Sequence, residues 1–241
     1  MKIIKIILVF FLLTGCTATQ INQTIGAVGD ILNENSTTSL TSTQVASGLK
    51  EALTKGVTKG AANVSQPDGY LKNLNIKIPF PPEVKKVEDK LRQLGMGKLV
   101  DDFVITLNRG AEDAAKSAKP IFVNAITSMT IQDAWSILKG DDNAATSYLK
   151  NVTTSQLTAK FKPVIQSSLN KVNATKYYSD IISTYNKIPL VTKVNPNLDD
   201  YATQKAIDGL FYMIEKEEKL IRKDPVARTT ELLKKVFSQQ N

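Results

Sequence analysis

From about residue 41 onward, apolar residues recur every three or four positions, which is the spacing of one face of an α-helix. The first stripe carries Val45, Leu49 and Leu53. It follows Thr41, which has Gln44 three positions later, the pattern of a capping box at a helix N-terminus. A helical period sustained over most of a chain predicts an all-α fold.

Start and stop signals divide this region into about eight or nine expected helices. Gly95 is expected to end one helix, and Pro120 to kink or break another. Residues 141–142, both Asp, are expected to cap a short helix, and Asp224 followed by Pro225 to start the last one. The apolar stripes after the first span residues 84–94, 99–114, 121–126, 135–138, 148–149, 161–169, 177–185, 206–214 and 232–237.

Only residues 74–80 alternate between apolar and polar with the period of two that marks a β-strand. Pro79 has no N–H to donate, which confines this segment to an edge strand or an extended arm. Residues 190–194 are its one candidate partner, so at most one short β-ribbon is expected. The expected fold is therefore a single all-α domain over residues 41–238, or two helical lobes that meet near residue 140.

The N-terminus has the pattern of a bacterial lipoprotein signal. Two lysines precede an apolar run over residues 6–13, which is too short to span a membrane. Residues 13–16 read Leu-Thr-Gly-Cys and resemble the lipobox of bacterial lipoproteins. This resemblance implies lipidation of Cys16 and cleavage after Gly15, with residues 1–15 as the signal peptide.

Residues 16–40 begin with the lipidated Cys16 and are rich in Thr, Ser, Asn and Gln, so they are expected to form a flexible tether. Two or three acyl chains anchor a protein stably where a single chain does not. Thr17 stands where lipoproteins retained in the inner membrane typically carry Asp. We therefore expect an exported protein that is anchored in the bacterial envelope, at the outer membrane and facing the periplasm in a Gram-negative cell.

The composition removes several classes of catalytic site. The 241 residues include no histidine, so neither an imidazole base nor a Ser-His-Asp triad nor a His-ligated zinc site can form. The single cysteine cannot form an internal disulfide or a thiolate cluster. No metal, cofactor or catalytic residue is assigned. The net charge of +8 falls to +6 without the two lysines of residues 1–15, and the lysines are taken to be dispersed along the chain.

Short motifs that are weak singly and specific together are spread along the helical region. They are Gly48–Leu53, Asn108-Arg109, Ala111-Glu112, Met129-Thr130, Asp133-Ala134, Asp141-Asp142, Ala144–Thr146, Asn195-Pro196, Leu198–Tyr201, Gly209–Phe211, Glu217-Glu218, Ile221-Arg222, Asp224-Pro225 and Arg228-Thr229. Through these motifs the chain resembles the bacterial lipoproteins grouped as domain of unknown function 4197, over about residues 40–237. The resemblance implies an all-helical envelope lipoprotein. Because the activity of that family is uncharacterised, it implies no catalytic residue.

Arginine is rare in this lysine-rich chain, and its planar guanidinium suits bidentate contacts with carboxylates. Three arginine–carboxylate pairs have the spacing of helical ion pairs: Arg109 with Glu112, Arg222 with Glu218, and Arg228 with Asp224. We expect these six residues to form structural ion pairs that position helix ends. The alternative is a basic pocket for an anionic ligand.

These observations favour a non-enzymatic interaction or ligand-binding module on a membrane anchor. One alternative is a carboxylate-dependent peptidoglycan hydrolase that uses Glu112, Glu217 or Glu218, because two acids suffice for glycoside cleavage. Another is a carrier of a lipid or other apolar ligand between helices. Besides the membrane, the expected partner is an envelope protein or an anionic envelope polymer. Nucleic acid is not expected, because the protein is exported.

Overall fold

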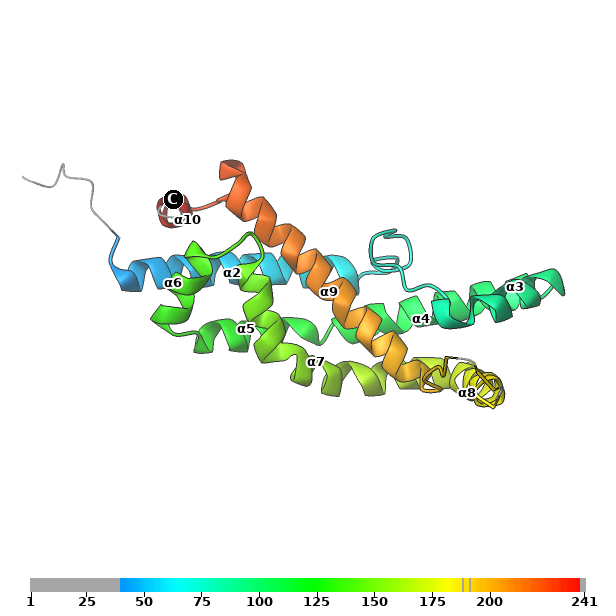
Figure 1. The fold of residues 1–241 in the computed structure, drawn as a ribbon. Helices are drawn as coiled ribbons and strands as arrows, with labels where there is room; N and C mark the ends of the chain where they lie inside the picture. Colours follow the sequence, from blue (N-terminus) through cyan, green and yellow to red (C-terminus); the bar gives the residue numbers. More distant parts are fainter. Residues whose placement is uncertain (1–39, 188, 191, 239–241) are drawn as a thin grey trace, which may run out of the picture. The chain divides into compact units, whose positions relative to one another are not determined.

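The helical period is present throughout the computed structural model, which describes residues 40–187, 189–190 and 192–238 (Figure 1). Within these residues there are nine α-helices, two short 3-10 helices and no β-strand. The elements are α2 (Ser42–Ser65), η1 (Pro82–Val84), α3 (Lys85–Gln93), α4 (Gly97–Ala115), α5 (Ala118–Ser128), α6 (Ile131–Lys139), α7 (Ala144–Asn170), α8 (Ala174–Tyr185), α9 (Leu198–Lys223), η2 (Pro225–Ala227) and α10 (Glu231–Phe237). The all-α prediction is confirmed for this part of the chain.

Helix α2 begins at the predicted position. The Gln44 N–H donates to the Thr41 hydroxyl at 3.2 Å and the Thr41 N–H donates to the Gln44 side chain at 2.9 Å, so the predicted capping box forms. The apolar stripe of α2 packs against α9, α5, α6 and α10, and α9 crosses α2 (Figure 1). A Cβ on Gly60 would lie 3.2 Å from a side-chain carbon of Ile214, so the two helices approach closely at this crossing.

Helix α7 replaces the two helices expected between residues 144 and 170. Its buried residues include every fourth position from Ala145 to Leu169. At about 100° per residue, each step of four turns the buried face by about 40°, so the stripe winds around the helix. One long helix can therefore pack against α4, α5, α6 and α9. Pro163 lies inside α7 without ending it.

Residues 74–80 do not form the strand that their alternation suggests, and no described residue belongs to a strand. Instead, Asn108 of α4 takes the place of a neighbouring strand. Its side chain accepts a hydrogen bond from the Ile78 N–H at 2.9 Å and donates one to the Ile78 carbonyl at 2.8 Å. Asn186, after α8, makes the same two bonds with Val194, at 2.9 and 2.8 Å. The backbone N–H and carbonyl groups of Ile78 and of Val194 thus bond to asparagine side chains, and the two segments do not pair with each other.

The described helices belong to one compact unit that begins at Leu40, so the alternative of two lobes is not observed. A single cluster of buried apolar side chains extends from α2 to α10. Among the residues that the structure describes, no helix is both long and apolar enough to cross a membrane. The expected signal peptide, Cys16 and the tether lie outside the described residues, except for Leu40.

Candidate functional site

The six charged residues chosen from the sequence fall into two groups and not one cluster. Arg109 and Glu112 lie on α4, against the turn that follows α2. Glu218 and Arg222 lie near the C-terminal end of α9. The turn of the first group contacts α9 at Ala206, twelve residues before Glu218, which is about 18 Å along the helix axis.

The Glu218–Arg222 ion pair joins two helix ends and is shielded from solvent, with side-chain exposures of 5% and 2%. The Arg222 Nε donates to Glu218 at 2.9 Å. The Glu218 carboxylate also accepts hydrogen bonds from the N–H groups of Ala145 and Thr146, at 2.9 and 2.8 Å, and from the Thr146 hydroxyl at 2.8 Å. The Arg222 guanidinium also donates to two carbonyl oxygens in the last turn of α6, at 2.7 and 3.3 Å.

Each charge of this pair lies at the helix end that stabilises it. The Glu218 carboxylate lies at the N-terminus of α7 and the Arg222 guanidinium at the C-terminus of α6, where the helix dipoles favour an anion and a cation. The side-chain cap of α7 therefore comes from α9. Residues 141–142, which were expected to provide it, do not, and Asp142 pairs with Lys223. The Glu218 carboxylate and the Arg222 guanidinium therefore both bond to backbone groups at helix ends.

Arg228 and Asp224 do not form the expected pair, because α9 ends at Lys223 and the helical spacing is lost beyond it. Arg228 donates to two carbonyl oxygens in the last turn of α9, at 3.0 and 2.6 Å, and its guanidinium lies 5.3 Å from the centre of the Phe237 ring. Asp224 accepts a hydrogen bond from the Val226 N–H at 2.8 Å and so caps η2. Both residues stabilise the end of α9.

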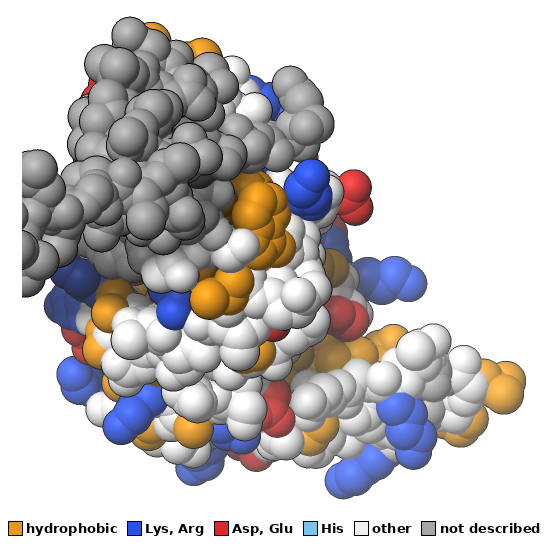
Figure 2. All heavy atoms as spheres, turned by 90° about the vertical axis from the view of Figure 1, so that its left-hand side faces the viewer, with side chains coloured by type: hydrophobic (Ala, Val, Ile, Leu, Met, Phe, Trp, Pro, Cys, Tyr) orange, Lys and Arg blue, Asp and Glu red, His pale blue; other side chains and the backbone are white. Residues whose placement is uncertain are grey.

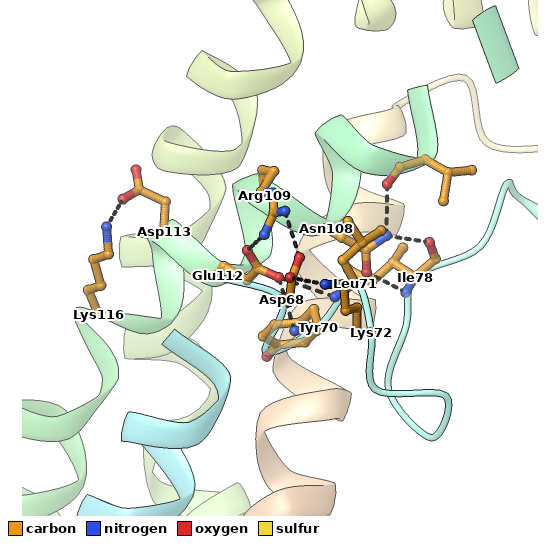
Figure 3. Close-up of polar contacts among 11 residues, drawn as sticks. Asp68, Tyr70, Leu71, Lys72, Ile78, Asn108, Arg109, Glu112, Asp113 and Lys116 are labelled. Atoms are coloured by element: carbon orange, nitrogen blue, oxygen red, sulfur yellow. Dashed lines mark hydrogen bonds and ion pairs between the residues drawn. The ribbon is translucent and has the colours of Figure 1, made fainter. Parts of the chain in front are cut away.

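Figure 3 shows the hydrogen bonds of the Arg109–Glu112 group, which repeats the arrangement at Glu218 but is open to solvent. Glu112 is buried and accepts hydrogen bonds from the N–H groups of Tyr70 and Leu71, both at 3.1 Å. Arg109 donates to Glu112 at 2.6 Å and to Asp68 at 2.7 Å. The Arg109 side chain remains 43% exposed. The carboxylate again fixes a backbone turn, while its arginine faces outward.

Tyr70 fixes the same turn from its other side and is fully buried. Its hydroxyl donates to the Ala206 carbonyl of α9 at 2.6 Å, and burial raises the pKa of this hydroxyl. A Cβ on Gly209 would lie 2.7 Å from the Tyr70 ring, which is closer than a side chain can approach. Because Gly209 has no side chain, the Tyr70 ring can pack against α9 at this position. This packing explains the glycine in the Gly209–Phe211 motif.

A cleft of about 470 Å³ lies beside the open group. Its lining residues are Ser65, Gln66, Pro67, Arg109, Glu112, Asp113 and Lys116. The charges in this cleft are already paired. Arg109 pairs with Asp68 and Glu112, and Lys116 pairs with Asp113 at 2.8 Å. The cleft has no excess positive charge with which to hold an anionic ligand.

Asp68 remains an anion that compensates Arg109. Hydrogen bonds from Lys72 and Arg109 hold the pKa of the Asp68 carboxyl below its ordinary value of 3.8. A second cleft, of about 310 Å³, adjoins the first at Asp113. Its lining residues are Asp113, Pro163, Val164, Ser167, Ser168 and Lys171. Charged and hydroxyl side chains line both clefts, and neither cleft is an enclosed cavity.

The carboxylates considered for catalysis serve other purposes in this structure. Glu112 accepts three hydrogen bonds within the fold. Glu217 pairs with Lys59 at 2.9 Å, and Glu218 is enclosed between helix ends. In the described part of the chain, no group of three acidic, cysteine or histidine side chains is placed to hold a metal ion. The carboxylates at the open cleft, Glu112 and Asp113, are thus both bonded to donors of the fold.

Two residues that build the open group have no signal in the sequence pattern: Asp68 and Tyr70. Their contacts with Arg109 and Glu112 join positions that are 41 and 42 residues apart, so helical spacing does not mark them. Asn108 and Gly209 lie in two of the motifs, but the motifs do not show that Asn108 bonds to Ile78 or that Gly209 makes room for Tyr70.

Comparison of the chain with curated proteins and with solved structures gave no match. A family model described as protein of unknown function (DUF4197) matches residues 39–238. The match includes every helix from α2 to α10 and confirms the resemblance drawn from the sequence motifs. The chain belongs to the DUF4197 family.

Proposed function

We propose that the protein is a lipoprotein of the bacterial envelope that is anchored through Cys16 and carries a non-enzymatic interaction module. One observation carries the anchor: two lysines, a short apolar run and Leu-Thr-Gly-Cys at residues 13–16 coincide with the only cysteine of the chain. Each buried CH₂ of an acyl chain contributes about 0.8 kcal/mol to membrane binding, so two or three chains hold the domain at the membrane. In a Gram-negative cell, Thr17 after the cysteine favours the outer membrane.

The state of the charged residues supports an interaction module over a hydrolase. Glycoside cleavage needs one acid to donate a proton and a second to act as base or nucleophile. In the open cleft, Glu112 is held by three donors and Asp113 by Lys116. Both clefts are also open to solvent and lie beside charged side chains, whereas a carrier of apolar molecules needs an enclosed apolar cavity.

Metabolic labelling with radioactive palmitate tests the anchor. The wild type is expected to incorporate label, and Cys16→Ser is expected to lose it because the acylated thiol is gone. Thr19→Ser, three positions away, is the matched control and should label like the wild type. Equal labelling of the wild type and Cys16→Ser would contradict the proposed anchor.

Incubation of the purified protein with peptidoglycan tests the non-enzymatic assignment. We expect no release of soluble glycan fragments. Release that disappears in Asp113→Asn, in a variant whose unfolding is unchanged, would replace the proposal with a carboxylate-dependent hydrolase. Asp113 suits this comparison because its side chain is 55% exposed on the cleft and its contact is an ion pair with Lys116.

A further inference from the structure

The net positive charge of the chain is confined to one segment. Residues 16–143 contain fourteen basic and fourteen acidic side chains, and residues 198–241 contain eight of each. Residues 144–197 contain seven lysines and one aspartate. The whole excess of +6 that remains after residue 15 therefore belongs to α7, α8 and the segment that leads to α9. The lysines themselves are dispersed along the chain, as expected, but the net charge is not, because residues 144–197 contain almost no acidic side chains.

Six of the seven lysines in this segment are exposed, and none of the six forms an ion pair with another described residue. They are Lys150, Lys160, Lys171, Lys176, Lys187 and Lys193. The seventh, Lys162, pairs with Asp199 and Asp200 at 3.5 and 2.6 Å. Lys150, Lys160 and Lys171 fall within about 80° of arc around α7, given 3.6 residues per turn. The segment thus presents uncompensated positive charge, whereas the other residues after residue 15 are neutral overall.

Exposed apolar side chains lie among these lysines where α7 is followed by α8. Val172 is 49% exposed, Tyr177 60% and Ile181 38%. Tyr177 and Ile181 are four residues apart on α8 and so share a face. Lys171 directly precedes Val172 and Lys176 directly precedes Tyr177, and both lysines are exposed as well. These five residues are called the α7–α8 corner.

Figures 1 and 2 show where α8 lies in the domain and which side chains surround it. In Figure 1, α8 is seen nearly end-on, away from the end of the domain at which α2 begins. Figure 2 views the domain from that α2 end, and the lobe at its lower right, where α8 lies, carries lysine and hydrophobic side chains with few acidic ones. Asp180, also on α8, is the one acidic residue of the segment.

We infer that the α7–α8 corner docks on an anionic lipid surface. Lysines near such a surface are attracted to the headgroup phosphates, and tyrosine and aliphatic side chains are stabilised at the level of the headgroups. The exposed Val172, Tyr177 and Ile181 favour a lipid surface over an acidic polysaccharide, which would need only the lysines. This inference rests on the proposed function, because the anchor keeps the domain close to a membrane.

The chain length between the proposed anchor and the domain permits this docking. Residues 17–39 can span up to about 75 Å when fully extended. Helix α2, whose start and α8 lie toward opposite ends of the domain in Figure 1, is about 36 Å long. The tether is therefore long enough for the α7–α8 corner to reach the membrane that carries Cys16.

Lysine reactivity in reconstituted vesicles tests the inference. The full-length protein is held by its N-terminal segment in vesicles of phosphatidylcholine, with or without phosphatidylglycerol, and lysines modified by an amine-reactive reagent are quantified by mass spectrometry. Phosphatidylglycerol is expected to lower the reactivity of Lys160, Lys171 and Lys176 at least about 5-fold. Lys205 and Lys216, exposed on α9, should keep their reactivity. High salt is expected to remove the protection.

Matched variants separate docking from other effects. Lys171→Gln combined with Lys176→Gln should restore the reactivity of Lys160 on anionic vesicles, whereas Lys205→Gln combined with Lys216→Gln, an equal change in charge, should not. Tyr177→Ser should weaken the protection without changing its dependence on salt.

Equal reactivity on the two kinds of vesicle overturns the inference, and so does protection by an acidic polysaccharide but not by phosphatidylglycerol. Loss of palmitate labelling bears on the anchor alone, because the uncleaved N-terminal segment still holds the chain at the vesicle.

Discussion

The buried carboxylates of Glu112 and Glu218 hold the backbone in the same way but in different surroundings. Each accepts hydrogen bonds from the N–H groups of two consecutive residues far away in the chain, and each pairs with an arginine on its own helix. Arg222 is 2% exposed and also bonds to the end of α6. Arg109 is 43% exposed and also bonds to Asp68. One arrangement is a closed link on α9, and the other is an open link on α4.

The comparison shows that residue type and helical spacing do not by themselves distinguish a structural ion pair from a binding site. Solvent access decides how costly it is to break the pair. A buried charge that loses its partner remains uncompensated in a medium that solvates it poorly. A charge at the surface is solvated by water once its partner is removed. Substitutions at the closed and the open link are therefore expected to lower the stability of the fold by different amounts, and the largest effect is expected at the closed link.

Arg222→Met should give the largest loss of stability. It leaves the Glu218 carboxylate buried without its cation and removes the donors to the last turn of α6. We expect the free energy of unfolding, measured by urea denaturation, to fall by about 3–5 kcal/mol. A loss of less than about 1 kcal/mol would show that the closed link contributes little to the fold.

Gly209→Ala should have an intermediate effect in the open region. The added Cβ would lie 2.7 Å from the Tyr70 ring and 3.1 Å from Ile76, so the turn that Glu112 holds must shift. Overpacking of this kind costs about 1–3 kcal/mol. Gly56→Ala in α2 is the matched control. Its nearest neighbours would be 3.7 Å away, so it should stabilise the helix by up to about 1 kcal/mol. Equal effects at the two glycines would contradict the tight contact at Tyr70.

Arg109→Met should have a small effect, although it removes the same type of ion pair as Arg222→Met. Glu112 keeps its two bonds from backbone N–H groups, and it lines the open cleft beside Arg109, so water can take the place of the lost guanidinium. We expect a loss of about 1 kcal/mol or less in the same urea experiment. A loss as large as that of Arg222→Met would mean that the open link is as essential as the closed one.

Asp68→Asn should have the smallest effect, and one that depends on pH. The pKa of Asp68 is lower in the folded protein than its ordinary value of 3.8, so its carboxylate stabilises the fold at pH values above 3.8. This stabilisation is lost as the pH falls through the lowered pKa. The thermal midpoint of the wild type should therefore exceed that of Asp68→Asn at neutral pH and approach it in acid. A constant difference between the two midpoints would contradict this role of the charge.

The sequence predicts the features of this fold that depend on neighbouring residues. The capping box at Thr41 is local, so it marks the start of α2 correctly. Helix α7 is predicted as two pieces because its buried stripe advances in steps of four and shows no constant face. The strand predicted over residues 74–80 is wrong because residues 74–76 form a turn that is closed by bonds to the Asn73 carbonyl, and because Ile78 bonds to Asn108, 30 positions away.

In the candidate site, too, the sequence predicts the contacts between neighbouring residues and not those between distant ones. The pairs Arg109–Glu112 and Arg222–Glu218 are visible in the sequence because both partners lie on one helix. Their contacts with other elements span 41 to 85 positions, and no periodicity encodes them. The solvent exposure of the arginine side chain, which is 2% for Arg222 and 43% for Arg109, also depends on packing. The confinement of the net charge to residues 144–197, in contrast, can be counted from the sequence alone.

The most direct test of the difference between the closed and the open link is the coupling energy of each ion pair. Two double-mutant cycles, Glu218→Gln with Arg222→Met and Glu112→Gln with Arg109→Met, isolate it from other effects of each substitution on the free energy of unfolding. We expect about 2–3 kcal/mol for Glu218 with Arg222 and less than about 1 kcal/mol for Glu112 with Arg109. Equal coupling energies, or a larger one for the Arg109 pair, would contradict the distinction between a closed and an open link.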